Sequence, residues 1–175
     1  MKTAIFSYSF TGNNEKLAQS VARELLVEQI KITEPTERTV GKITADAIFN
    51  RVPQVLPSPG KLLDYDMILF FGPVWIGQVA FPLRAYLQYL RKNPKDYAFI
   101  SLSGGPNGPN PKLESELISR TAKNPIALIN LYIAGLLPSE PKPTPKDIDS
   151  YKLKEEDIIN LTQTVLGKLS GSITE

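Results

Sequence analysis

A short polar loop at residues 9–14 contains side chains that are suited to binding an anion. Its residues are Ser9, Phe10, Thr11, Gly12, Asn13 and Asn14. The two hydroxyls can donate hydrogen bonds, Gly12 permits a tight turn, and a helix that starts here offers unpaired backbone N–H groups at a positive dipole end. The loop can therefore hold a phosphate without Lys or Arg. The alternative is that it only turns the chain and caps the helix.

A second loop, at residues 72–77, contains the only tryptophan of the chain. Its residues are Gly72, Pro73, Val74, Trp75, Ile76 and Gly77, and they follow an apolar run. An indole at this place can stack on a flat aromatic ring, and Gly77 allows the backbone to approach that ring closely. The alternative is that Trp75 is a core or lid residue.

A third loop, at residues 103–110, is small and rich in glycine. Its residues are Ser103, Gly104, Gly105, Pro106, Asn107, Gly108, Pro109 and Asn110. Its N–H groups can meet the polar edge of a ring-shaped ligand, and the alternative is a flexible surface loop. No aromatic residue occurs between Phe99 and Tyr132.

The composition excludes much of the chemistry that proteins perform with their own side chains. The 175 residues include no His and no Cys, which excludes a Ser-His-Asp triad, a Cys nucleophile, a disulfide and an Fe–S cluster. A zinc site built from these ligands is also excluded, no metal site is expected, and a bound cofactor would carry any redox chemistry. The chain spreads 20 Lys+Arg and 18 Asp+Glu along its length, so no nucleic-acid-binding surface is predicted. The glycine spacings of nucleoside triphosphate loops and of dinucleotide-binding loops are absent as well.

The elements that must position these loops are short apolar runs alternating with amphipathic segments. The strand-like runs are residues 3–8, 67–71, 97–102 and 126–133, with a weaker edge-strand pattern at 27–33. Near-continuous apolar runs of this length are typical of strands buried on both faces of a parallel sheet. The helical stripes lie at residues 17–25, 83–90, 113–118 and 158–169, while 44–63 favours a short helix followed by a proline-bent loop.

This alternation predicts an α/β domain with a doubly wound parallel sheet, spanning residues 1–175 without an internal linker. Ligands of such sheets bind beyond the carboxyl ends of the strands, which is where the three loops lie. The proline-rich segment 138–145 is interpreted as a stiff connector to the last helix, with a polyproline-type partner motif as the alternative. The sequence shows neither a signal peptide nor a membrane-spanning run, so a cytoplasmic location is expected.

Three segments in the same order resemble the flavodoxin superfamily. They are the Ser-x-Thr-Gly-Asn pattern at residues 9–13, the segment 64–77 and the segment 97–107. The resemblance covers almost the whole chain and is of the short-chain type, with Asn14 where Thr is more usual. It implies a five-stranded parallel sheet of order 2-1-3-4-5 that binds FMN, with the phosphate at the first loop and the flavin ring at the other two.

The resemblance also assigns residues to the flavin. The implied FMN-binding residues are Ser9, Phe10, Thr11, Gly12, Asn13, Asn14, Pro73, Val74, Trp75, Ile76, Gly77, Ser103, Gly104, Gly105 and Asn107. In this superfamily a backbone carbonyl of the second loop meets the N5 hydrogen of the reduced flavin. Gly77 is the candidate for this catalytic role, and Ile76 is the alternative.

The expected function is that of an FMN-dependent oxidoreductase, which passes reducing equivalents from NAD(P)H or a protein donor to a quinone, flavin or protein acceptor. One alternative is a non-catalytic carrier that moves single electrons between protein partners, and another is a domain that has lost flavin and only binds a partner. The sequence pI near 8.7 lacks the acidic character of carrier flavodoxins. The third loop also lacks the aromatic ring with which those carriers cover the flavin, so one flavin face is expected to stay open to a second flat molecule, such as a nicotinamide or a quinone. The donor, the acceptor and the oligomeric state, a homo-oligomer included, stay open.

Overall fold

The computed structural model describes residues 1–36, 38–105 and 110–173. Its centre is a sheet of five parallel strands in the order β2-β1-β3-β6-β7. The strands are β1 (Thr3–Ser7), β2 (Glu28–Lys31), β3 (Met67–Phe71), β6 (Asp96–Ser103) and β7 (Ala127–Tyr132). Numbered by these five strands alone, the order is 2-1-3-4-5, so the predicted flavodoxin-like sheet is confirmed.

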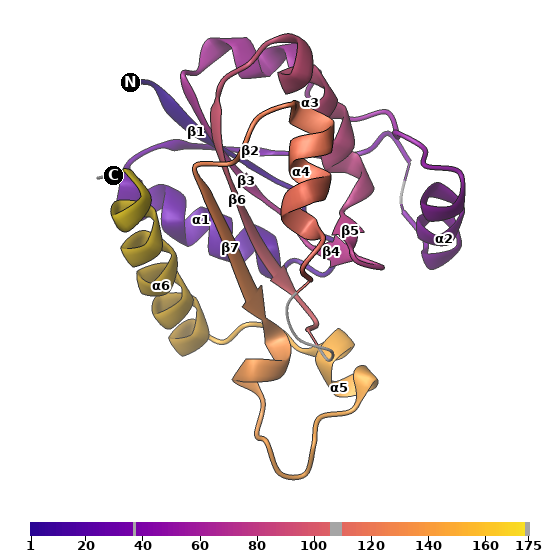
Figure 1. Cartoon of the computed structure of the whole chain (residues 1–175). Coiled ribbons are helices and arrows are strands. Elements are labelled where there is room, and N and C mark those ends of the chain that lie inside the picture. Colours follow the sequence, from indigo (N-terminus) through magenta and orange to yellow (C-terminus); the bar gives the residue numbers. More distant parts are fainter. Residues whose placement is uncertain (37, 106–109, 174–175) are drawn as a thin grey trace.

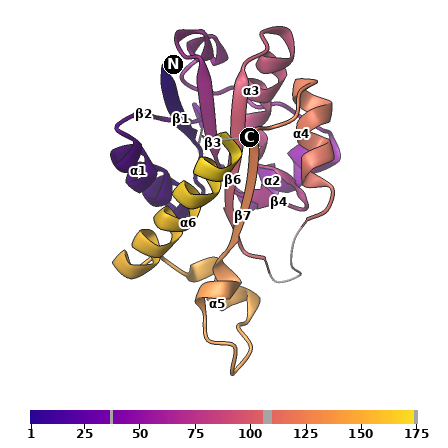
Figure 2. The same cartoon turned by 60° about the vertical axis from the view of Figure 1, so that its left-hand side comes forward.

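Helices cover both faces of this sheet (Figures 1 and 2). Helices α1 (Asn13–Leu25) and α6 (Glu155–Ile173) pack together on one face, while α3 (Phe81–Lys92) and α4 (Leu113–Thr121) pack together on the other. Because side chains alternate along a strand, Phe6 joins the buried cluster under α3 and α4, and Ile5 joins the one under α1 and α6. Burial on both faces explains why the strands form continuous apolar runs in the sequence.

The predicted strands are confirmed within two residues at either end. The ambiguous segment 44–63 contains helix α2 (Val40–Ile48), which begins earlier than predicted, and the 3₁₀ helix η1 (Pro59–Asp64). Two further short strands were not predicted, β4 (Val74–Trp75) and β5 (Gln78–Val79), which form an antiparallel hairpin inside and beyond the second loop. Among the described residues, no helix is long and apolar enough to cross a bilayer.

The connection between β7 and α6 contains more structure than the predicted stiff connector. It includes the 3₁₀ helix η2 (Ile133–Leu136) and helix α5 (Pro145–Ser150), and both lie beyond the carboxyl edge of the sheet (Figure 1). Helix α5 begins with a capping box, since the Thr144 hydroxyl accepts from the Asp147 N–H and the Asp147 carboxylate accepts from the Thr144 N–H. The connection therefore returns an ordered helix to the edge at which ligands of such sheets bind.

Candidate functional site

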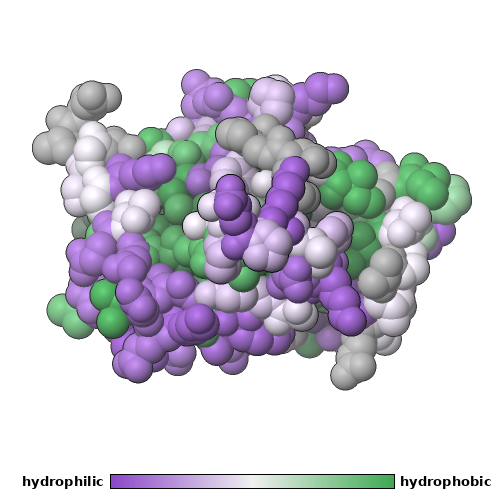
Figure 3. Space-filling model, turned by 90° about the horizontal axis from the view of Figure 1, so that it is seen from below, coloured by the Kyte–Doolittle hydropathy of each residue, from purple (hydrophilic) through white to green (hydrophobic). Residues whose placement is uncertain are grey.

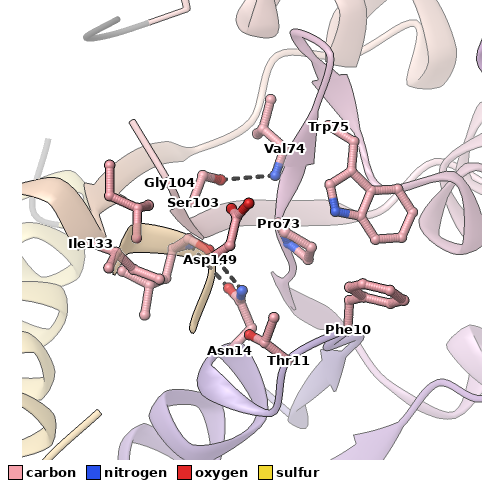
Figure 4. Close-up of a pocket in the computed structure, with 12 residues that line it drawn as sticks. Phe10, Thr11, Asn14, Pro73, Val74, Trp75, Ser103, Gly104, Ile133 and Asp149 are labelled. Carbon is pink, nitrogen blue, oxygen red and sulfur yellow. Dashed lines mark hydrogen bonds between the residues drawn. The ribbon is translucent and has the colours of Figure 1, made fainter. Parts of the chain in front are cut away.

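The loops after β1, β3 and β6 meet at the carboxyl edge of the sheet, because parallel strands end at the same edge. Together with residues after β7 and from α5, they line a cavity of about 190 Å³ (Figure 4). The lining residues are Phe10, Thr11, Asn14, Pro73, Val74, Trp75, Leu102, Ser103, Gly104, Ile133, Ile148 and Asp149. Seen from this edge, apolar surface lies on either side of a central group of polar side chains (Figure 3).

The structure brings together residues from all three loops that the sequence singles out. The remaining predicted residues that the structure describes belong to the same loops without lining the cavity, namely Ser9, Gly12, Asn13, Ile76, Gly77 and Gly105. Asn107, which the sequence also assigns to the flavin, lies outside the described residues. The binding roles of these residues therefore stay predictions.

The first loop presents the start of α1 to the cavity. Gly12 is the residue before the helix, its φ of 92° is in the left-handed region that favours glycine, and no side chain caps the helix. The Ser9 hydroxyl accepts a hydrogen bond from the Gly12 N–H at 3.0 Å, which fixes the turn. The Thr11 hydroxyl lines the cavity and makes no hydrogen bond within the described residues. The loop thus offers one hydroxyl and the first N–H groups of α1 to an anion.

The two asparagines of this loop are engaged by the protein itself. The buried Asn14 amide donates to the Leu102 carbonyl at 2.8 Å, and its oxygen accepts from the Leu102 N–H at 3.0 Å. Asn13, also buried, donates to the Tyr151 carbonyl at 2.8 Å and accepts from the Leu153 N–H at 3.1 Å. Both side chains hold the first loop against distant segments, so their contribution to a bound phosphate would come from the backbone N–H groups.

The second loop contains a two-residue hairpin turn between β4 and β5. Ile76 and Gly77 form the turn with φ values of 51° and 73°, the combination that a type I′ turn requires and that Asn-Gly adopts most easily. The carbonyl of Gly77 accepts a hydrogen bond from the Asn110 side-chain amide, and the Val74 N–H donates to the Ser103 hydroxyl at 2.8 Å. Two hydrogen bonds thus join the second loop to the third, and one of them engages the carbonyl that the resemblance assigns to the flavin.

Trp75 lines the cavity and also packs in an aromatic cluster. Its ring meets those of Tyr8, Phe10 and Phe81 edge-to-face, with centroids 5.6, 5.9 and 5.6 Å away. The guanidinium of Arg38 lies 5.7 Å from the indole centroid. Trp75 is therefore a packing residue with one side on the cavity, and its stacking on a ligand ring stays a prediction.

A buried charged cluster from the β2–α2 segment supports this tryptophan. Arg38 donates to Glu34 at 2.6 Å and to Asp46 at 2.7 Å, and its side chain is 3% exposed. Burial alone would lower the pKa of Arg38, but the hydrogen bonds to Glu34 and Asp46 raise it above its ordinary value. Burial, together with the Glu34 carboxylate, raises the pKa of Tyr8. No sequence pattern indicates this cluster, because its members are isolated charges in a polar segment.

A second buried arginine lies behind the aromatic cluster. The Arg84 guanidinium is stacked on Phe81 at 4.0 Å and donates to the Arg51 carbonyl at 3.1 Å, while its Nε finds no partner in the described structure. Burial and the neighbouring Arg120 lower the pKa of Arg84 to about 10. The buried guanidinium of Arg84 therefore packs behind the hairpin and α3. Nothing in the α3 stripe predicts that Arg84 faces inward.

The structure describes the third loop at residues 103–105 and at Asn110. Ser103 and Gly104 line the cavity. Gly105 has a φ of 69°, and a Cβ at this position would overlap the ring of Tyr132. Tyr132, at the end of β7, therefore packs directly on the backbone of the third loop, and only glycine fits beneath it.

The structure adds a wall to the cavity that the sequence did not predict. Ile148 and Asp149 of α5 line it, and Asp149 is the only charged side chain among the lining residues. Lys152, just beyond α5, donates to the Thr11 carbonyl at 2.6 Å. These residues lie over 130 positions from the first loop in the chain, so only the folded structure brings them to the site. Within the described residues, no group of His, Cys, Asp and Glu could hold a metal ion.

Comparison with known proteins gives matches at the level of structure. No family model and no curated protein matches the sequence. The fold is similar to that of a Lactobacillus acidophilus flavoprotein solved in complex with FMN, with a TM-score of 0.57 and 22% identity over 74% of this chain and 92% of that one. It is also similar to a "putative flavoprotein" from Bacteroides eggerthii, with a TM-score of 0.65 and 14% identity over 74% and 87% of the two chains. The strand order and these matches establish a flavodoxin-like fold.

Proposed function

We propose that the chain binds FMN in the cavity at the carboxyl edge and passes reducing equivalents through it. One observation carries this proposal: the three loops converge on a single cavity that has the uncapped start of α1 and the Thr11 hydroxyl on one side and Trp75 on another. The FMN complex of the Lactobacillus acidophilus flavoprotein supports it, because that protein has the same fold.

The residues present fit this group. Thr11 and the first N–H groups of α1 would hold the phosphate, since an uncapped helix start favours an anion. Trp75 and Val74 would face the flavin ring, and Ser103 and Gly104 would meet its polar parts. Bound FMN supplies a ring that takes up and releases electrons or hydride. None of the residues that line the cavity has a side chain whose ordinary pKa lies near neutrality. The contribution of the chain is therefore to bind the flavin, to orient it and to shield it from solvent.

The specific reaction that we propose is transfer of reducing equivalents from NAD(P)H to a quinone, flavin or protein acceptor. The near-balanced charge of the chain supports it, because a carrier that is steered to basic partners would need an acidic face. The runner-up is a carrier between protein partners.

The first test asks whether FMN binds at this cavity. Trp75 is the only tryptophan, so titration of the apoprotein with FMN should quench its emission. Thr11→Val should lower FMN affinity about tenfold, since it removes a hydrogen bond to a charged group and keeps the side-chain shape. Thr164→Val on the exposed side of α6 is the matched control and should leave affinity unchanged. Unchanged Trp75 emission, with no flavin retained, would contradict the proposal.

The second test separates enzyme from carrier. The FMN-loaded protein is mixed rapidly with NADPH or with NADH, and the flavin absorbance is followed, then a quinone is added. An oxidoreductase loses the flavin absorbance with one of the two nucleotides and recovers it with the quinone. A flavin that stays oxidised with both nucleotides, yet is reduced by light, would refute the enzyme and support the carrier.

A further inference from the structure

The segment around α5 is fastened to the first loop by three contacts. Asn13 bonds to the Tyr151 carbonyl and to the Leu153 N–H, and the Lys152 ammonium bonds to the Thr11 carbonyl. The buried side chain of Ile148 holds α5 against the rest of the protein. Asp149, one residue further along, is therefore held at a defined place and is not a side chain of a free loop.

The Asp149 side chain is exposed to solvent and lines the candidate site. Figure 4 shows Asp149 between the first and third loops with its carboxylate on the side of Val74 and Ser103, and it lines the cavity together with Thr11 and Asn14. No other lining residue is charged. The neighbouring cation, Lys152, donates to the first loop through the Thr11 carbonyl and does not line the cavity.

A carboxylate in this place acts on the charge of a ligand. A phosphate at the start of α1 carries up to two negative charges, and the solvent-exposed Asp149 carboxylate on the same cavity carries another, so the two groups repel each other, most strongly at low ionic strength. The same carboxylate can accept hydrogen bonds from the hydroxyls of a polyol chain, which do not depend on the phosphate. Asp149 therefore has opposite effects on the two ends of a phosphorylated flavin.

We infer that Asp149 is a specificity-determining residue that weakens the preference of the site for FMN over unphosphorylated riboflavin. This inference rests on the proposed function, because it concerns the same cavity and the same ring. Because of Asp149, bound FMN exchanges with the solution more readily than it would if only the start of α1 and the Thr11 hydroxyl held the phosphate. The ratio of the two dissociation constants measures the effect, since riboflavin shares the ring and the polyol chain with FMN and lacks only the phosphate.

The test compares FMN and riboflavin binding to the full chain and to Asp149→Asn, which keeps the side-chain shape and removes the charge. At low ionic strength Asp149→Asn should tighten FMN binding by about five- to twentyfold relative to riboflavin, and added salt should shrink this gain. Asp149→Ser should give the same direction, which separates charge from shape. Glu24→Gln, which removes one exposed carboxylate at the far end of α1, is the control for net charge and should leave the ratio unchanged.

Two results overturn the inference and can be told apart. If the wild-type chain binds FMN but the ratio is the same in Asp149→Asn and Asp149→Ser, the charge of Asp149 does not reach the phosphate, and the proposed function stands. If the wild-type chain binds neither flavin, the proposed function fails and the inference falls with it. Circular dichroism of each variant shows that it is folded before the constants are compared.

Discussion

Replacing Asn14 with Ala should destabilise the protein far more than an exposed loop residue would. Asn14 is 3% exposed, and its amide satisfies both the N–H and the carbonyl of Leu102 at the end of β6. Each buried backbone group left without a partner costs about 1–3 kcal/mol, so the two together amount to about 2–6 kcal/mol. For a domain of this size, that is about 4–24 °C in the unfolding temperature.

The assay is urea unfolding followed by circular dichroism, with thermal unfolding as a second measurement. Asn110→Ala is the matched control, because it also removes an amide that bonds to a backbone carbonyl, but at an exposed site. This control should lose less than about 1 kcal/mol. A loss below about 1 kcal/mol for Asn14→Ala as well would refute the reasoning. It would mean that water replaces the amide and that Asn14 does not tie α1 to the end of β6.

Three further changes test the loops. Ile76→Asn should stabilise the protein by about 1 kcal/mol in urea unfolding, because a β-branched residue is strained at a φ of 51°; a loss of stability would show that Ile76 makes contacts that outweigh the strain. Gly105→Ala should lower the unfolding temperature by several degrees, since its Cβ would overlap Tyr132 at a φ of 69°, and an unchanged temperature would contradict this packing. Hydrogen bonding by Thr144 lowers the pKa of Asp147 below its ordinary value, so the capping box stabilises α5 above about pH 4 and is lost as the pH falls through the lower, folded-state pKa. Amide exchange in α5 should therefore accelerate in acid, and the same acceleration in Asp147→Asn would argue against the box as its cause.

The sheet and the position of the site were predictable because they depend on local patterns. The apolar runs at residues 3–8 and 67–71 are buried on both faces of the sheet, so their composition alone indicates parallel strands. Parallel strands bring their following loops to one edge, which is why the sequence alone assigns the three loops to one candidate site. The direction of the strands and their burial are therefore enough to predict the sheet and the edge at which the loops meet.

The roles of individual side chains were less predictable, because they depend on partners far along the chain. Asn13 and Asn14 suit a phosphate loop by type, yet their amides bond to segments 88 and more positions away. The hairpin turn was missed because Ile76 is a poor residue for a positive φ, so propensity argues against the turn that forms. Asp149 follows a proline-rich stretch that is typical of a connector, and only tertiary structure shows that it faces the cavity.

The bonds of Asn13 also determine when the cavity can form. Its partners, Tyr151 and Leu153, are 138 and 140 positions further along the chain. Contacts of such sequence separation form late, since the loop between them must close first. In the order of the chain, the segments that form the three loops and the start of α1 come before the segment that forms the last wall. The cavity therefore acquires its last wall only when Tyr151 and Leu153 reach Asn13, so its closure depends on one of the most distant contacts in the chain.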